Sequence, residues 1–222
     1  MLEIFERQEY HAMMLLTFFV ASILGLNEHG NSVQEYNSAL QPRTPQDIPL
    51  LLRVLTPIMK ASVCKRSIHA LQECMEALGG VGYLDNSESE SINIARLYRD
   101  CCVNSIWEGT TDVLSSDTLR VLKGRSGDEV LAALDRWIDD ALSAPKNSLR
   151  EERRALSDAW ATLRKTISGP SYEDLLSKAR DLTFTIANII MGTLLVIDAE
   201  SDSNPAVFEI CSRFLRDKNI TQ

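Results

Sequence analysis

Features typical of fibrous, disulfide-rich and metal-binding proteins are scarce in this chain of 222 residues. Ten Gly and seven Pro are too few for collagen-like or long low-complexity stretches. The cysteines are odd in number, at five, and none form a CxxC pair, which argues against a disulfide framework and against a zinc site. We therefore expect reduced thiols and an intracellular location, with the cytoplasm preferred and mitochondria or peroxisomes left open.

Alternation of apolar and polar residues with a period of two is also missing, and no repeat of fixed length is present. Aromatic residues make up only 6% of the chain, whereas 45% of all residues are hydrophobic. This composition suits helices that pack through Leu, Ile, Val, Ala and Met. The length lies within reach of one hydrophobic core. The sequence therefore predicts an all-α protein, an antiparallel helical bundle with a C-terminal helical extension.

Acidic residues outnumber basic ones, and the formal net charge is −8. General binding of nucleic acid needs clustered Lys and Arg, so this negative charge argues against a general nucleic-acid-binding protein. DNA stays open as a partner only through a local basic stripe, because residues 146–222 hold 11 basic and 11 acidic side chains. The candidates for that stripe are Arg150, Arg153, Arg154, Arg164 and Lys165. The alternative is a solvated face, since acidic residues at 151, 152 and 158 lie among them.

An apolar stretch near the start runs from Ala12 to Leu26, about fifteen residues. A membrane-spanning helix needs about 20 residues, and a secretory signal has a basic region before its apolar core. Here Glu3, Glu6 and Glu9 precede the stretch. We therefore expect a buried core helix and no membrane span.

Helical periodicity and end signals divide the chain further. A first helix is expected over residues 2–26, and a second begins with Thr44 as its cap and runs to Leu78. Pro57 should kink or interrupt the second helix, and Gly79-Gly80 should end it. The clearest break is at residues 123–127, which divides the chain into parts 1–124 and 125–222. Further expected elements are a loop at 85–91 and helices at 92–101, 111–122, 128–143, 147–167, 171–197 and 205–217, with Ser126, Ser171 and Asn204 or Ser203 as candidate caps.

Two short segments have a use in chemistry. Residues 76–83, EALGGVGY, place glycines where a helix ends, which permits close approach of the backbone to another chain or a ligand. The alternative is a helix cap followed by a tight turn. Residues 106–112, IWEGTTD, place the Glu108 carboxylate beside a glycine at a helix start, where it could act as a base on a bound substrate. The alternative is an ordinary acidic residue before a helix.

Together the segments GGVGY, RLYRD and IWEGTTDVL resemble the carboxy-terminal signature of acyl-CoA dehydrogenases. In that family a Q-x-x-GG-x-G-[YF] pattern is followed by RD and then by [IY]-[YW]-EGT. The order and spacing match over about residues 44–123, and more loosely from residue 1. The stretches CKRS and VNSIWEG look closest to the AidB-like branch, named for its bacterial alkylation-response member.

The resemblance implies a reaction and a set of site residues. Glu108 would remove the α-proton of an acyl-CoA thioester while FAD accepts a hydride. The remaining assignments by position are Trp107 and Gly109 beside the substrate, Thr110, Thr111 and Asp112 beside the FAD, and Glu76, Gly79 and Gly80 beside the adenosine-diphosphate part of an FAD bound mainly by another subunit. Glu76 stands where the family usually has Gln, and Asp112 where Gln or Asn is common, so both contacts are in doubt.

The resemblance also implies domains that precede this region in the family, an N-terminal helical domain and a middle β-domain. We therefore expect this chain alone to bind FAD weakly or not at all. Two alternatives are an AidB-like role in DNA binding and a non-catalytic role in oligomerisation. Bundles of this family form dimers or tetramers, so a homo-oligomer is expected.

Overall fold

The computed structural model describes residues 2–30, 40–85, 92–143, 149–202 and 204–221, with side chains described from Gln8 onward. These residues form α-helices and no strand, which confirms the all-α prediction. The helices are α1 (Leu2–His29), α2 (Asp47–Ala77), α3 (Gly80–Tyr83), α4 (Ile94–Val103), α5 (Thr111–Lys123), α6 (Gly127–Leu142), α7 (Arg150–Ser168), α8 (Tyr172–Leu176), α9 (Ala179–Asp202) and α10 (Pro205–Asp217).

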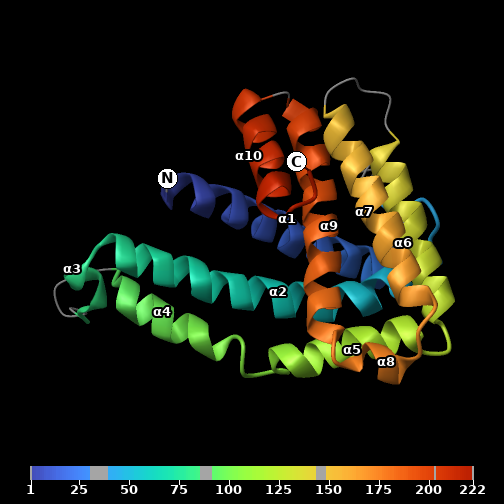
Figure 1. Cartoon of the computed structure of the whole chain (residues 1–222), viewed down its shortest axis with the longest axis horizontal. Coiled ribbons are helices and arrows are strands. Elements are labelled where there is room, and N and C mark those ends of the chain that lie inside the picture. Colours follow the sequence, from blue (N-terminus) through green and yellow to red (C-terminus); the bar gives the residue numbers. More distant parts are fainter. Residues whose placement is uncertain (1, 31–39, 86–91, 144–148, 203, 222) are drawn as a thin grey trace.

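The bundle is built around α1, α2 and α9 (Figure 1). Helices α1 and α2 run antiparallel, and α9 crosses them, with α10 on one side and α6 and α7 on the other. Leu16 of α1, Leu55 of α2 and Ile190 of α9 have no exposed surface, and they belong to one hydrophobic core. That core also includes residues of α6, α7 and α10, so the extension predicted for residues 125–222 packs directly on the first part. The division at residue 124 stays a prediction.

Two helices are long and apolar enough to cross a membrane by length and composition, Gln8–His29 and Ala179–Ser201. Core helices satisfy the same criterion, and 78% of the apolar window of the second lies buried inside the protein, against 39% for the first. The expectation of a buried helix therefore holds for one face of α1, where Leu16 and Ile23 are fully buried, while Phe18 is 68% exposed.

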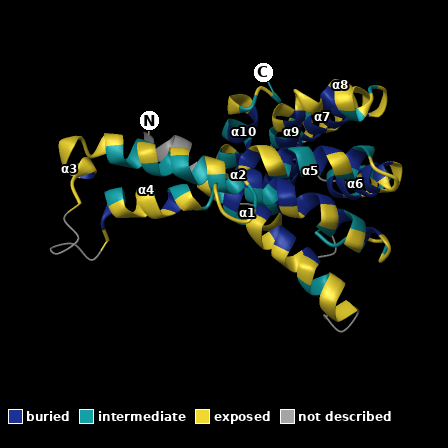
Figure 2. Ribbon diagram, turned by 90° about the horizontal axis from the view of Figure 1, so that it is seen from below, coloured by how far each residue is buried: buried dark blue, intermediate teal, exposed yellow. Residues whose placement is uncertain are grey.

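An arm projects from the bundle. It consists of the end of α2, α3 and α4 (residues 70–85 and 92–103), and α4 returns antiparallel along α2 (Figure 1). Exposed residues cover much of its surface (Figure 2). Several of them are large and apolar, including Tyr83, which is 79% exposed, and Ile92, which is 75% exposed. The arm therefore rests on the rest of the described chain mainly through α2.

The start of α2 differs from the prediction. The helix begins at Asp47 after Gln46, and Thr44 contributes only its carbonyl oxygen, which accepts from the Asp47 amide at 2.9 Å. The Asp47 side chain is buried and accepts two hydrogen bonds from Arg136 of α6, at 2.5 and 2.8 Å. A tertiary ion pair therefore replaces the local cap that the sequence suggested.

Other expectations of helix ends had mixed outcomes. Ser171 forms a capping box with Asp174, and the Asn204 side chain accepts from the Ala206 amide, which confirms both caps. Ser126 is the N-cap residue of α6, as predicted, but its side chain makes no cap bond. The helix expected over 171–197 is two helices, α8 and α9, and most of the loop expected at 85–91 lies outside the described residues.

Pro57 does not interrupt α2, which continues to Ala77. Proline removes one backbone hydrogen bond and crowds the carbonyl of the fourth residue before it. Pro57 itself is buried, and the neighbouring core residues Leu55 and Ile58 have no exposed surface. The burial of these apolar side chains stabilises α2 by more than the missing backbone hydrogen bond costs, so the helix continues past Pro57.

Arg153 does not belong to the candidate basic stripe on α7. Its guanidinium lies inside the bundle, 7% exposed, and forms an ion pair with Glu200 of α9. Arg164 is turned toward Asp135 of α6 at 3.3 Å. Arg154 is exposed and lies 3.7 Å from Asp158 one turn along. These contacts favour the solvated-face alternative over a phosphate-binding stripe.

Candidate active site

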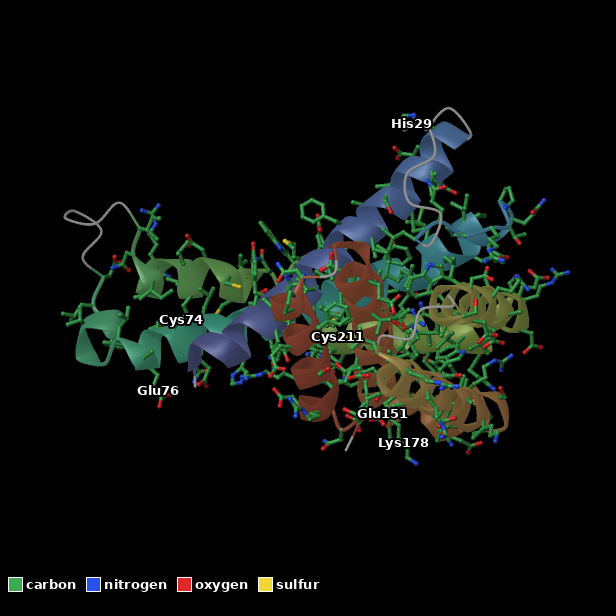
Figure 3. All side chains as sticks on the ribbon, turned by 90° about the horizontal axis from the view of Figure 1, so that it is seen from above. His29, Cys74, Glu76, Glu151, Lys178 and Cys211 are labelled. Carbon is green, nitrogen blue, oxygen red and sulfur yellow. The ribbon has the colours of Figure 1, made fainter. Side chains whose placement is uncertain are left out.

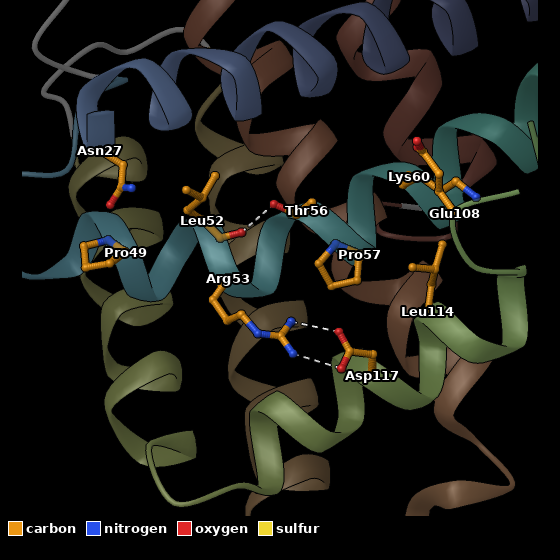
Figure 4. Close-up of a pocket in the computed structure, with 10 residues that line it drawn as sticks. All are labelled: Asn27, Pro49, Leu52, Arg53, Thr56, Pro57, Lys60, Glu108, Leu114 and Asp117. Carbon is orange, nitrogen blue, oxygen red and sulfur yellow. Dashed lines mark hydrogen bonds and ion pairs between the residues drawn. The ribbon is translucent and has the colours of Figure 1, made fainter. Parts of the chain in front are cut away.

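A cavity of about 530 Å³ lies where α1, α2 and α5 meet the segment between α4 and α5 (Figure 4). Asn27 and Pro49 lie at one end of it, and Lys60 and Glu108 lie at the other. Its walls include apolar side chains such as Leu52. The described residues contain no cluster of three or more side chains that could hold a metal ion. The cavity therefore combines apolar walls with a few charged groups.

Two carboxylates line this cavity, and their surroundings differ. Asp117 of α5 accepts two hydrogen bonds from Arg53 of α2, at 2.8 and 2.9 Å (Figure 4). These hydrogen bonds hold the pKa of Asp117 below its usual range. Glu108 is exposed, and within the part of the chain that the structure describes its carboxylate has no hydrogen bond or ion pair. Asp117 is thus neutralised by its partner, whereas Glu108 is available to a ligand.

The backbone at Glu108 and Gly109 is unusual. Glu108 has φ 54°, in the left-handed region that non-glycine residues rarely adopt, and Gly109 has φ 104°. A residue held in such a conformation costs about 1–3 kcal/mol, and such residues gather at functional sites. A Cβ added to Gly109 would also lie 3.1 Å from the Leu114 side chain. Gly109 therefore adopts a positive φ that another residue would reach only with strain, next to the point where the Glu108 carboxylate enters the cavity.

The N-terminus of α5 lies directly after this turn. Thr110 is its N-cap in extended conformation, is exposed, and makes no side-chain cap bond. Thr111 is only 7% exposed, so its side chain faces the protein interior. Asp112 is exposed and lies 3.3 Å from Arg180 of α9. Of the three residues assigned to flavin, Thr110 and Asp112 are accessible and Thr111 is largely covered.

The predicted site residues of the arm lie apart from Glu108. Lys60 of α2 contacts the residues on both sides of Glu108. Gly79 lies 19 residues further along the chain, which corresponds to about 28 Å at the rise of an α-helix. Glu76 is exposed and lies on the arm, well away from the bundle that contains Cys211 (Figure 3). The structure therefore does not bring Glu76, Gly79 and Gly80 together with Glu108 within one chain.

Gly79 directly follows Leu78, the C-cap of α2, and is the N-cap of α3 with φ 64°, so a glycine stands where α2 ends, as predicted. Gly82 is also needed for packing, because a Cβ there would lie 2.3 Å from the Met75 carbonyl oxygen. At Gly82, the close backbone approach expected from the glycines is thus an approach to Met75 of the same chain. This observation supports the cap-and-turn alternative without testing a ligand contact at Gly79 or Gly80.

The cationic side of the cavity was not predicted from the sequence. Arg53 and Lys60 are seven residues apart on α2, which places them on one face of the helix. The Lys60 ammonium donates to the carbonyl oxygens of Trp107 and Gly109, at 2.5 and 2.6 Å. The spacing of Arg53 and Lys60 can be seen in the sequence, but only the fold shows that Asp117 and the EGT segment face these two cations.

Two family models match the chain in succession. The model described as acyl-CoA dehydrogenase, C-terminal domain, matches residues 33–123, and the model described as acyl-CoA dehydrogenase 11 C-terminal domain-like matches residues 129–221. The chain belongs to the acyl-CoA dehydrogenase family. This acyl-CoA dehydrogenase region is 35% identical over 205 residues to acyl-CoA dehydrogenase family member 11 of Caenorhabditis elegans, an alignment that covers 87% of this chain and 30% of that protein.

A bacterial relative and two solved structures are also similar to this chain. The putative acyl-CoA dehydrogenase AidB of Escherichia coli K12 is 37% identical over 115 residues, which cover 48% of this chain and 20% of AidB. The crystal structure of C. elegans ACDH-11 in complex with C11-CoA superposes with a TM-score of 0.80 at 29% identity and covers 97% of this chain and 35% of that one. The apo form of Bd2924 superposes with a TM-score of 0.59 at 32% identity, and the match covers 86% of this chain and 32% of that one. This chain spans about a third or less of these relatives.

Proposed function

We propose that Glu108 is the catalytic base of a flavin-dependent acyl-CoA dehydrogenase site to which this chain contributes the base-bearing part. The observation that carries the proposal is the contrast between the two carboxylates of the cavity. Arg53 neutralises Asp117, whereas the Glu108 carboxylate has no partner among the described residues. A base that removes a proton must be free to reach it.

An acyl-CoA thioester is the substrate class that we infer. The family supports this inference, and so does the relative ACDH-11, which was solved with C11-CoA. Apolar side chains such as Leu52 and Leu114 line the cavity beside Glu108 and Lys60. A carboxylate at the end of a partly apolar cavity suits removal of a proton from a carbon next to a thioester carbonyl, with Trp107 and Gly109 flanking it.

FAD is the cofactor that we infer, and the start of α5 fits it. Gly109 presents no side chain, and the exposed Thr110 hydroxyl makes no cap bond, so both leave room for a flat ligand at a positively polarised helix terminus. Asp112 is accessible there as well, although it already lies beside Arg180. When bound, FAD supplies the hydride acceptor, while Glu108 takes and holds the α-proton.

A homo-oligomer, a dimer or tetramer, would bring the arm to the flavin of another subunit. The exposed position of Glu76 and Gly79-Gly80 supports such a contact from outside the bundle. Exposed apolar residues on the arm, such as Tyr83, favour burial against a second chain. Light scattering of the protein and of a Tyr83→Glu variant tests the association, which the variant should weaken.

The proposal is tested in the complete protein or complex that contains this chain. Glu108→Gln should lower acyl-CoA-dependent flavin reduction by about 10²- to 10⁴-fold, the range in which a positioned base contributes. Exchange of the substrate α-proton with deuterated water should fall in parallel. Glu129→Gln, on the exposed side of α6, is the matched control and should leave both rates unchanged. Full activity of Glu108→Gln would remove the catalytic assignment.

A further inference from the structure

The segment that carries Glu108 is held by one side chain from another helix. The Lys60 Nζ atom of α2 donates to the Trp107 carbonyl oxygen at 2.5 Å and to the Gly109 carbonyl oxygen at 2.6 Å. These two carbonyls belong to the residues immediately before and after Glu108. In the described structure Lys60 makes no ion pair with the Glu108 carboxylate. The ammonium thus holds the backbone on both sides of Glu108 and leaves its carboxylate free.

Few other bonds hold this segment. The Trp107 amide donates to the Val103 carbonyl at 3.2 Å, and the ladder of α5 resumes only where the Leu114 amide donates to Thr110 at 2.9 Å. Among the described residues, the amides of Glu108 and Gly109 donate to no protein acceptor. The positive φ angles at both residues are therefore not enforced by backbone hydrogen bonds. Hydrogen bonds from an ammonium to carbonyl oxygens are stronger than neutral ones, so Lys60 is the side chain best placed to enforce them.

Lys60 is itself held in place by the core. Ile58, two residues before it, has no exposed surface, and Ala61, the next residue, is 2% exposed. The helix that carries the ammonium is thus packed on both sides of it. The segment around Glu108, in contrast, has exposed side chains at Ile106 and Trp107. A rigid helix therefore positions an otherwise exposed segment.

We propose that Lys60 is the positioning residue for Glu108: its ammonium clamps the Trp107 and Gly109 carbonyls and thereby fixes the direction in which the Glu108 carboxylate enters the cavity. The functional part of this inference rests on the proposed function of Glu108 as a base. The structural part, the clamp itself, can be measured without any reaction. A misplacement of about 1 Å at a catalytic group can cost on the order of 100-fold in rate, so the clamp has a kinetic consequence.

The experiment compares Lys60→Met, Lys60→Arg and the control Lys65→Met in the complete flavin-loaded protein. Lys65 lies on the same helix, is exposed, and lines a different pocket. Lys60→Met removes the ammonium and keeps an unbranched side chain of nearly the same length, whereas Lys60→Arg keeps donors that can reach two carbonyls. Hydrogen–deuterium exchange of residues 104–110 measures the clamp, and flavin reduction by acyl-CoA measures its effect on the base. If Lys60→Met does not fold, Lys60→Gln replaces it.

In Lys60→Met we expect exchange in residues 104–110 to quicken about tenfold, with exchange in α6 and α7 unchanged. The limiting rate of flavin reduction should fall by about 10- to 100-fold with little change in the substrate concentration at half-saturation. Lys60→Arg should restore most of both properties, and Lys65→Met should match the parent protein.

Unchanged exchange and unchanged reduction in Lys60→Met would refute the clamp. Failure of Lys60→Arg to restore either property would also count against a positioning role. Glu108→Gln measured alongside separates the two proposals. If it is inactive while Lys60→Met behaves as the parent, only the clamp fails; if it is fully active, the base assignment fails and the exchange data alone decide the clamp.

Discussion

The buried ion pair between Arg153 of α7 and Glu200 of α9 gives a sharp prediction of stability. Each residue is only 7% exposed, and the pair joins two helices that share the core. Removal of one partner breaks the buried ion pair, and breaking a buried pair in this way costs about 3–5 kcal/mol. For a protein of this size each kcal/mol shifts the unfolding midpoint by about 2–4 °C. Arg153→Met should therefore lower the midpoint by about 6–20 °C.

Thermal unfolding followed by circular dichroism measures this effect, and the neighbouring residue provides the control. Arg154 is also a cation of α7, but its ion pair with Asp158 is exposed, and such pairs contribute about 0–1 kcal/mol. Arg154→Met should therefore leave the midpoint nearly unchanged. The double variant Arg153→Met with Glu200→Leu should recover most of the loss, because apolar residues then replace both charges of the buried pair. Equal midpoints for Arg153→Met and Arg154→Met would refute this reasoning.

Two further predictions concern pH and the turn at the site. Burial would raise the pKa of Glu9, but ion pairs with Arg66 and Lys218 outweigh burial and lower it below its ordinary 4.5. These ion pairs stabilise the protein above pH 4.5, and this stability is lost as the pH falls through the lower pKa of Glu9 in the folded state. Glu9→Gln should therefore flatten the decline of the unfolding midpoint between about pH 5 and 2. An unchanged slope in the variant would contradict this prediction. Gly109→Ala should destabilise by about 1–3 kcal/mol in denaturant unfolding, because its φ is 104°. The control Gly169→Ala, at an open position with φ −79°, should cost less than about 0.5 kcal/mol, and equal losses would exclude backbone strain as the cause.

Most of the helices could be predicted from the sequence because apolar periodicity and glycine or proline breaks are local signals. The errors fall where a distant contact overrides such a signal. The break between α8 and α9 at Ser177 and Lys178 has neither Gly nor Pro, so nothing local marks it. Thr44 looked like a cap, but the buried pair of Asp47 with Arg136 fixes the start of α2 instead. Partners 89 residues apart cannot be seen in a pattern of neighbours.

The candidate site shows the same limit more clearly. The resemblance to a family motif drew attention to Glu108, but it did not predict which groups surround the carboxylate. Arg53 and Asp117 are 64 residues apart, and Lys60 is 47 residues from the first carbonyl that it contacts. Apart from the seven-residue spacing of Arg53 and Lys60, nothing local in the sequence marks these three residues. Only the packing of α2 against α5 brings them together.

That packing decides what each charged group of the cavity can do. Asp117 and Glu108 are nine residues apart in the sequence and carry the same functional group. Arg53 holds one of them as a paired anion, while Lys60 donates two hydrogen bonds to carbonyl oxygens and leaves the Glu108 carboxylate without a partner among the described residues. Had Lys60 instead paired with Glu108 itself, the carboxylate would be neutralised in the same way as Asp117. The difference between a structural ion pair and a candidate base thus lies in where two cations of one helix direct their hydrogen bonds.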